Sequence, residues 1–208
     1  MVLLSTAYLA PVSYYRQIQN NDAVIERFCN YQKQSYRNRC RIATEAGIMT
    51  LSIPVEKPAT IKALTRDIQI SRHDKWEHLH WTAITSAYNS SPFFEYYSDE
   101  FRPFFLHSAK YKYLFDFNQA LQETICPLLG INHHIKYSEE YMTASDNCHD
   151  LRQAIHPKRP SIEPNTLIPY YQVFTTRNGF TPDLSIIDLL FNMGPESILL
   201  LQKEPVKI

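Results

Sequence analysis

The stretch Arg37-Asn-Arg-Cys-Arg-Ile-Ala43, followed after Gly47 by Ile48-Met-Thr-Leu-Ser-Ile53, determines the expected fold class. The second segment alternates as strands do, the first is a strand candidate, and Gly47 suits a turn that leads into the second. Further strands are expected at residues 2–10, 23–28, 67–71 and 170–175. The first half of the chain is therefore expected to form a mixed or mostly antiparallel sheet.

Helical spacing dominates the middle of the chain. Trp76, His80, Ile84 and Ala87 share one face at intervals of three and four residues, which predicts a helix at about residues 75–86. Further helices are expected at residues 11–19, 93–105, 113–129 and 181–191. Strands followed by helices predict an α+β fold with the sheet packed against several helices. We expect one domain over residues 1–208, with a long polar loop at about residues 141–169.

Composition excludes several function classes. The formal net charge is zero, which argues against general nucleic-acid binding. Only 4 glycines are present and no GxGxxG or GxxxxGK[ST] pattern occurs, so a glycine-rich phosphate loop is not expected. No run of 18 apolar residues predicts a membrane span. The four cysteines form no CxxC pair, and we expect a cytoplasmic protein with reduced thiols and no metal.

A basic segment without acidic residues, 31–41, is the strongest candidate for binding. On a strand, Arg37, Arg39 and Arg41 would point to one face because side chains alternate. Neighbouring guanidiniums repel each other unless a multivalent anion such as a diphosphate lies across them. Lys33 and Tyr36 precede this strand closely enough to join such a site. The alternative is a solvated edge strand whose arginines pair with distant carboxylates.

Two further parts of the sequence contain side chains that are candidates for catalysis. His80 lies on the core-directed helix face, where it is either a general base or a hydrogen-bonded core residue. The expected long loop offers four charged or titratable side chains, namely Asp150, Arg152, His156 and Lys158. Cys148 just precedes them in a polar context, so a cysteine-dependent hydrolase or acyltransferase using Cys148 with His149 or His156 is a further alternative.

Several segments in one order resemble the WbqC-like protein family. They are Gln32-Lys-Gln-Ser-Tyr-Arg-Asn-Arg-Cys-Arg-Ile42, Leu51-Ser-Ile-Pro-Val55, Trp76 with His80, Ile84 and Tyr88, Ser91-Pro-Phe-Phe94, Leu129-Gly-Ile131, and Leu184-Ser-Ile-Ile-Asp-Leu-Leu-Phe-Asn192. The resemblance extends from about Tyr8 to Leu201. It implies a role around nucleotide-activated sugars in bacterial surface polysaccharide (O-antigen-type) biosynthesis, including acyl or aminoacyl transfer to an amino sugar.

The resemblance also implies site residues. Catalysis is expected at His80 and Tyr88, and substrate or phosphate binding at Lys33, Arg37, Asn38, Arg39 and Trp76. We expect a transferase or sugar-nucleotide-modifying protein whose partner is an anionic small molecule, without metal or organic cofactor. The rival is a non-catalytic protein that binds a sugar nucleotide or a partner enzyme. The oligomeric state is open, and the abundant Tyr and Phe suit a dimer surface as well as a core.

Overall fold

Two separate β-structures organise the chain, a four-stranded parallel sheet and a two-stranded antiparallel hairpin. The computed structural model describes residues 1–58, 60, 62–132, 135–143, 148–162 and 167–202. The sheet has the order β5-β2-β1-β6 and contains β1 (Val2–Ser5), β2 (Ala23–Glu26), β5 (Lys136–Tyr137) and β6 (His149–Asp150). The hairpin pairs β3 (Arg39–Thr44) with β4 (Gly47–Ser52).

All pairings within the four-stranded sheet are parallel. The prediction of a mixed or mostly antiparallel sheet is therefore wrong for the main sheet, and it holds only for the hairpin. The chain is still a mixture of helices and strands. The error has a physical origin, because β5 and β6 contribute two residues each and such short strands leave no periodicity in the sequence. One of them, β6, lies inside the predicted long loop.

Strand β1 lies inside the parallel sheet, between β2 and β6. Its residues Val2, Leu3 and Leu4 are all almost fully buried, as expected for a strand covered on both faces. Parallel neighbours need a crossover connection, and α1 (Val12–Asn20) provides it between β1 and β2. The longer connection from β2 to β5 contains the hairpin and the central helices.

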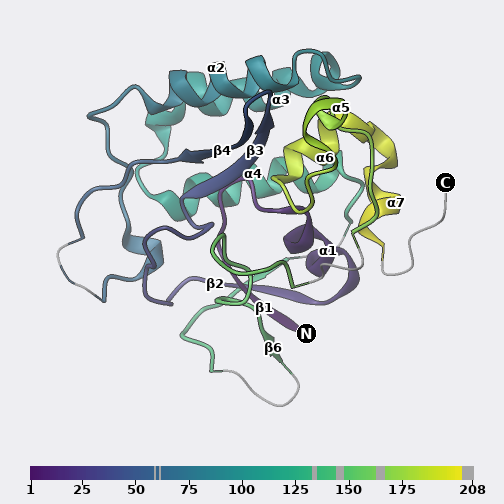
Figure 1. Cartoon of the computed structure of the whole chain (residues 1–208). Helices are drawn as coiled ribbons and strands as arrows, with labels where there is room; N and C mark the ends of the chain where they lie inside the picture. The colour runs from purple at the N-terminus through teal and green to yellow at the C-terminus, as the bar shows by residue number, and fades with distance from the viewer. Residues whose placement is uncertain (59, 61, 133–134, 144–147, 163–166, 203–208) are drawn as a thin grey trace.

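Three central helices follow the hairpin in the chain. They are α2 (Trp76–Tyr88), α3 (Phe94–Leu106) and α4 (Leu114–Leu128), which confirms the helices predicted there. In Figure 1, α2 and α3 lie at the top of the view beside β3 and β4, and the parallel sheet lies at the bottom near the N-terminus. Two short 3₁₀ helices, η1 (Thr65–Asp67) and η2 (Ser108–Lys110), occupy the connections.

The C-terminal part is helical. It contains α5 (Thr175–Asn178), α6 (Ile186–Met193), the 3₁₀ helix η3 (Gly194–Glu196) and α7 (Ser197–Leu201). The strand predicted at residues 170–175 is wrong, since residues 170–172 are irregular, residues 173–174 form a turn, and α5 begins at Thr175. The strand predicted at residues 67–71 is reduced to isolated bridges at Gln69 and Ile70.

Aromatic side chains fill the core between the helices. Phe191 of α6 makes edge contacts with Phe94 and Phe101 of α3, and Phe117 of α4 contacts Phe104. The aromatic side chains on the buried face of α3 are thus part of the core. Within the described ranges, no helix combines the length and the apolar character that crossing a membrane requires.

Candidate functional site

The parallel sheet has a topological switch point at β1. Strands β2 and β5 follow on one side of β1, whereas β6 pairs with β1 on the other side. In open parallel sheets, ligands bind beyond the carboxyl ends of the strands where the strand order reverses. A ligand-binding site is therefore expected in the loops that leave β1, β2 and β6.

A cavity of about 240 Å³ lies at this carboxyl edge. Residues at the ends of β2 and β6 line it together with three side chains from loops. They are Phe28, Cys29 and Asn30 after β2, Asp150 of β6 with Arg152 and Gln153 after it, and Gln32, Arg37 and Tyr141 from the loops. The cavity thus joins segments that are more than a hundred residues apart in the sequence.

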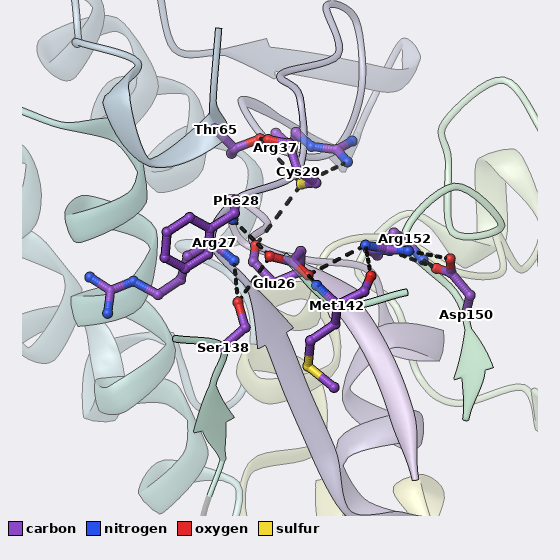
Figure 2. A network of polar contacts seen from close by, with 10 residues as sticks. All are labelled: Glu26, Arg27, Phe28, Cys29, Arg37, Thr65, Ser138, Met142, Asp150 and Arg152. Carbon is purple, nitrogen blue, oxygen red and sulfur yellow. Dashed lines mark hydrogen bonds and ion pairs between the residues drawn. The ribbon is translucent and has the colours of Figure 1, made fainter. Parts of the chain in front are cut away.

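Glu26, the last residue of β2, holds this edge together (Figure 2). Its carboxylate is fully buried, and Oε1 accepts hydrogen bonds from the Phe28 N–H at 2.8 Å and the Ser138 hydroxyl at 2.9 Å. Oε2 accepts from the Met142 N–H at 2.8 Å and lies 3.4 Å from Nη1 of Arg152. A buried carboxylate with four donors is well satisfied, so Glu26 fixes the loops around the cavity.

Arg152 is held by a second carboxylate. Its Nε and Nη2 donate to Asp150 Oδ1 and Oδ2 at 2.9 Å and 2.6 Å, a bidentate arrangement. Hydrogen bonding from Arg152 lowers the pKa of Asp150, so the pair stays ionised near neutral pH. The single positive charge of Arg152 is therefore fully engaged by the carboxylates of Asp150 and Glu26.

Arg37 presents the opposite case, because its charge is buried without a carboxylate partner. It is 2% exposed, and no carboxylate in the described residues lies within ion-pair distance. Its Nη1 reaches Gln32 Oε1 and Ser35 Oγ at 3.4 Å each, and its Nη2 reaches Cys29 Sγ at 3.7 Å. Its Nε has no hydrogen-bond partner among the residues that the structure describes. These contacts are long, so the guanidinium retains unused donors.

More positive charge surrounds Arg37. The turn that carries His156 and Lys158 lies beside the basic segment, since Lys158 Nζ donates to Gln34 Oε1 at 2.5 Å. Burial lowers the pKa of His156, and the cations Arg159, Lys158 and Arg37 lower it further. These three cations therefore lie close enough to the imidazole to disfavour its protonation.

The family model of the WbqC-like protein family matches residues 6–159. The chain belongs to the WbqC-like family. All the cavity residues lie within the matched segment, whereas α5, α6 and α7 lie beyond it. An uncharacterized protein of Mycobacterium tuberculosis, Rv1507c, is 27% identical over 190 residues, which covers 80% of this chain and 81% of that protein. No solved structure matches the chain.

In this WbqC-like chain, the cavity contains Arg37, Asp150 and Arg152 of the predicted site residues. The other predicted site residues of the basic segment, Lys33, Asn38 and Arg39, do not line it. Lys33 is exposed on a turn, and Asn38 is buried and donates to the Ile53 carbonyl at 2.8 Å. The predicted strand begins at Arg39 rather than Arg37, so Arg37 sits in a turn outside the shared face of the other two arginines.

Trp76, His80 and Tyr88 do not line this cavity. His80 is 5% exposed, and its Nδ1 lies 2.9 Å from the Tyr8 hydroxyl, while Trp76 packs edge-on against its ring. Burial lowers the pKa of His80 to about 4, so the imidazole is neutral. Tyr88 donates to Asp188 Oδ1 at 3.0 Å in a separate buried cluster. His80 and Tyr88 thus have the contacts of hydrogen-bonded core residues, and Trp76 is buried by packing, with no hydrogen-bond partner for its Nε1 among the described residues.

Several residues of the cavity region were not predicted from the sequence, among them Glu26, Cys29 and Tyr141. Glu26 left a usable signal, because a carboxylate that ends the apolar run Ala23-Val-Ile is costly to bury without partners. The polar context assigned to Cys148 is wrong, since its side chain is buried against Leu3 and Val24. In the described part of the chain, no three His, Cys, Asp or Glu side chains are grouped as metal ligands.

Proposed function

We propose that the cavity binds the phosphate groups of a nucleotide-activated sugar, with Arg37 as the main anion-binding residue. The chain would then act as a transferase or sugar-nucleotide-modifying protein in bacterial surface polysaccharide biosynthesis, the role that likeness to the WbqC-like family implies. Acyl or aminoacyl transfer to an amino sugar is the reaction class that the proposal favours.

The observation that carries the proposal is the unpartnered charge of Arg37. Burying an ionised group is costly unless it is paired, and the long contacts to Gln32, Ser35 and Cys29 offer only neutral acceptors. A phosphate oxygen supplies the missing negative charge, and the planar guanidinium binds it through two N–H groups. Nε of Arg37 and its remaining Nη hydrogens are the donors that this role requires.

The size of the cavity limits which part of the ligand it holds. Pockets that enclose a drug-sized ligand have volumes of about 300–1,000 Å³, and this cavity has about 240 Å³. It suits a diphosphate or a single sugar ring rather than a whole sugar nucleotide. The remaining part of the ligand would lie against residues at the rim.

Titration calorimetry with uridine diphosphate sugars tests the proposal. Removing a charged hydrogen-bond donor costs about 1.5–3 kcal/mol, so Arg37→Ala should weaken binding by about 10- to 150-fold. Arg39→Ala is the matched control, because it removes the same group from a position that does not line the cavity. Binding that is equally sensitive to both substitutions, or to neither, contradicts the assignment to Arg37.

A second candidate is a binding protein without catalysis. It is favoured by the position of His80, which lies outside the cavity, so the predicted base does not meet the anion site. Product analysis after incubation with a sugar nucleotide and an acyl or aminoacyl donor distinguishes the two. Tight, Arg37-dependent binding with no change of either ligand supports the binding protein, and a modified sugar supports the transferase.

A further inference from the structure

Tyr141 is an exposed aromatic residue at the rim of the cavity beside Arg37. It lines the cavity, yet 57% of its surface is accessible to solvent. A large aromatic side chain gains little stability from such a position, because most of its apolar area stays in water. Core packing therefore does not explain why a tyrosine is placed here.

The position of Tyr141 is nevertheless fixed, because both backbone groups of the next residue, Met142, are hydrogen-bonded. The Met142 N–H donates to Glu26 Oε2 at 2.8 Å, and the Met142 carbonyl accepts from Arg152 Nη1 at 3.0 Å. The guanidinium carbon of Arg152 lies 5.2 Å from the Tyr141 ring centroid, within the range of a cation–π contact. The same side chains that shape the anion site thus also hold this ring.

The other aromatic ring that lines the cavity is already covered. Arg66 lies 4.2 Å from the ring centroid of Phe28, and the Phe28 side chain is half-buried. Arg152 accounts for one contact of the Tyr141 ring, but the large exposed fraction leaves the rest of that ring open. Tyr141 is therefore the ring on which a planar group of the ligand can stack.

We propose that Tyr141 is the stacking residue for the nucleobase of a ligand whose phosphates contact Arg37. The proposal rests on the proposed function and specifies its ligand class as a nucleoside diphosphate derivative rather than a plain sugar phosphate. It also accounts for the small cavity, since the base lies on the rim and only the phosphates enter. Stacking does not discriminate strongly between bases, because every base offers a flat face.

Calorimetry with three probes tests this proposal: uridine diphosphate, adenosine diphosphate and inorganic pyrophosphate. Tyr141→Ala should weaken the binding of both nucleotides by about tenfold and change the binding of pyrophosphate by less than about twofold. Tyr141→Phe should keep nucleotide binding within about twofold of the wild type, because the ring is retained. Tyr171→Ala is the control, since Tyr171 is 56% exposed but does not line the cavity.

The outcomes separate this proposal from the one on which it rests. If pyrophosphate binds in an Arg37-dependent way but Tyr141→Ala leaves the nucleotides unaffected, the stacking role is overturned and the anion site stands. Equal weakening of pyrophosphate and nucleotides by Tyr141→Ala also overturns it, because the ring would then act only by positioning Arg152. If the wild type binds none of the three probes, both proposals fail.

Discussion

Nη1 of Arg152 lies 3.4 Å from Oε2 of Glu26, and this buried ion pair joins the carboxyl ends of β6 and β2. The two residues are separated by most of the family-matched segment. Because Asp150 binds the same guanidinium, the pair leaves Arg37 as the cavity-lining cation without a carboxylate partner in the described residues. The proposed anion site depends on this unequal distribution of charge.

Glu26→Gln tests the structural part of this arrangement. The amide keeps the shape of the side chain but loses the charge and one acceptor, so buried donors of Met142 or Ser138 lose a partner. We expect the free energy of unfolding to fall by about 1–3 kcal/mol in urea denaturation. Glu100→Gln in α3 is the exposed control and should change it by less than about 0.5 kcal/mol. A loss no larger than that of the control would show that the Glu26 network does not stabilise the edge.

His80 should make the stability depend on pH. Burial lowers its pKa from 6.5 to about 4, so below pH 6.5 the unfolded chain binds a proton that the folded chain rejects. The contribution of His80 is present above pH 6.5 and is lost as the pH falls towards 4, by about 3 kcal/mol in all. The stability deficit of His80→Gln relative to the wild type should therefore shrink between pH 6.5 and 4 in urea denaturation. A deficit that stays constant contradicts a neutral buried imidazole.

Asp188 should make the stability depend on pH in the direction opposite to that of His80. Burial raises its pKa from 3.8 to about 6, although Tyr170, Gln172 and Tyr88 donate hydrogen bonds to it. Between pH 4 and 6 the folded chain keeps a proton that the unfolded chain has lost, so stability falls as the pH rises, by about 3 kcal/mol. The deficit of Asp188→Asn should thus be largest at pH 4 and smaller at pH 6. Equal deficits at both pH values would show that this carboxyl is already ionised at pH 4.

Gly194, at the end of α6, should not tolerate a side chain. Its φ is +54°, and a Cβ at this position would lie 2.6 Å from atoms of the Phe93 ring. Gly130 has a φ of +73° but open space around it, so it serves as the matched control. Gly130→Ala should cost about 1 kcal/mol for backbone strain alone, and Gly194→Ala about 1–3 kcal/mol more, measured by thermal unfolding. Similar losses for both substitutions would mean that the Phe93 ring moves aside freely.

The helices were predictable because their signal is repeated over several turns. Trp76, His80, Ile84 and Ala87 share the buried face of α2, as their spacing predicts. The parallel sheet was not predictable, because β5 and β6 are defined by pairing with distant strands and not by their own two residues. A short buried strand such as β1 is a short apolar run in the sequence, and this pattern is the same in a parallel and in an antiparallel sheet.

The candidate site was predictable only in part, for a related reason. The absence of acidic residues near Arg37 is visible in the sequence, and so is the charged segment around Asp150 and Arg152. Their convergence depends on the reversal of strand order between β1 and β6, which no local pattern encodes. His80 was assigned from its residue type and the family resemblance, whereas its neighbours Tyr8 and Trp76 come together only in the fold.

The central claim, that Arg37 is an anion-binding residue at the carboxyl edge of the sheet, is tested most directly by a crystal structure with inorganic pyrophosphate. The claim predicts density for the anion in the cavity, with a phosphate oxygen about 2.7–2.9 Å from Nε or an Nη atom of Arg37. Pyrophosphate bound elsewhere, with the cavity beside Arg37 empty and its guanidinium still in contact with Gln32 and Ser35, would contradict the claim.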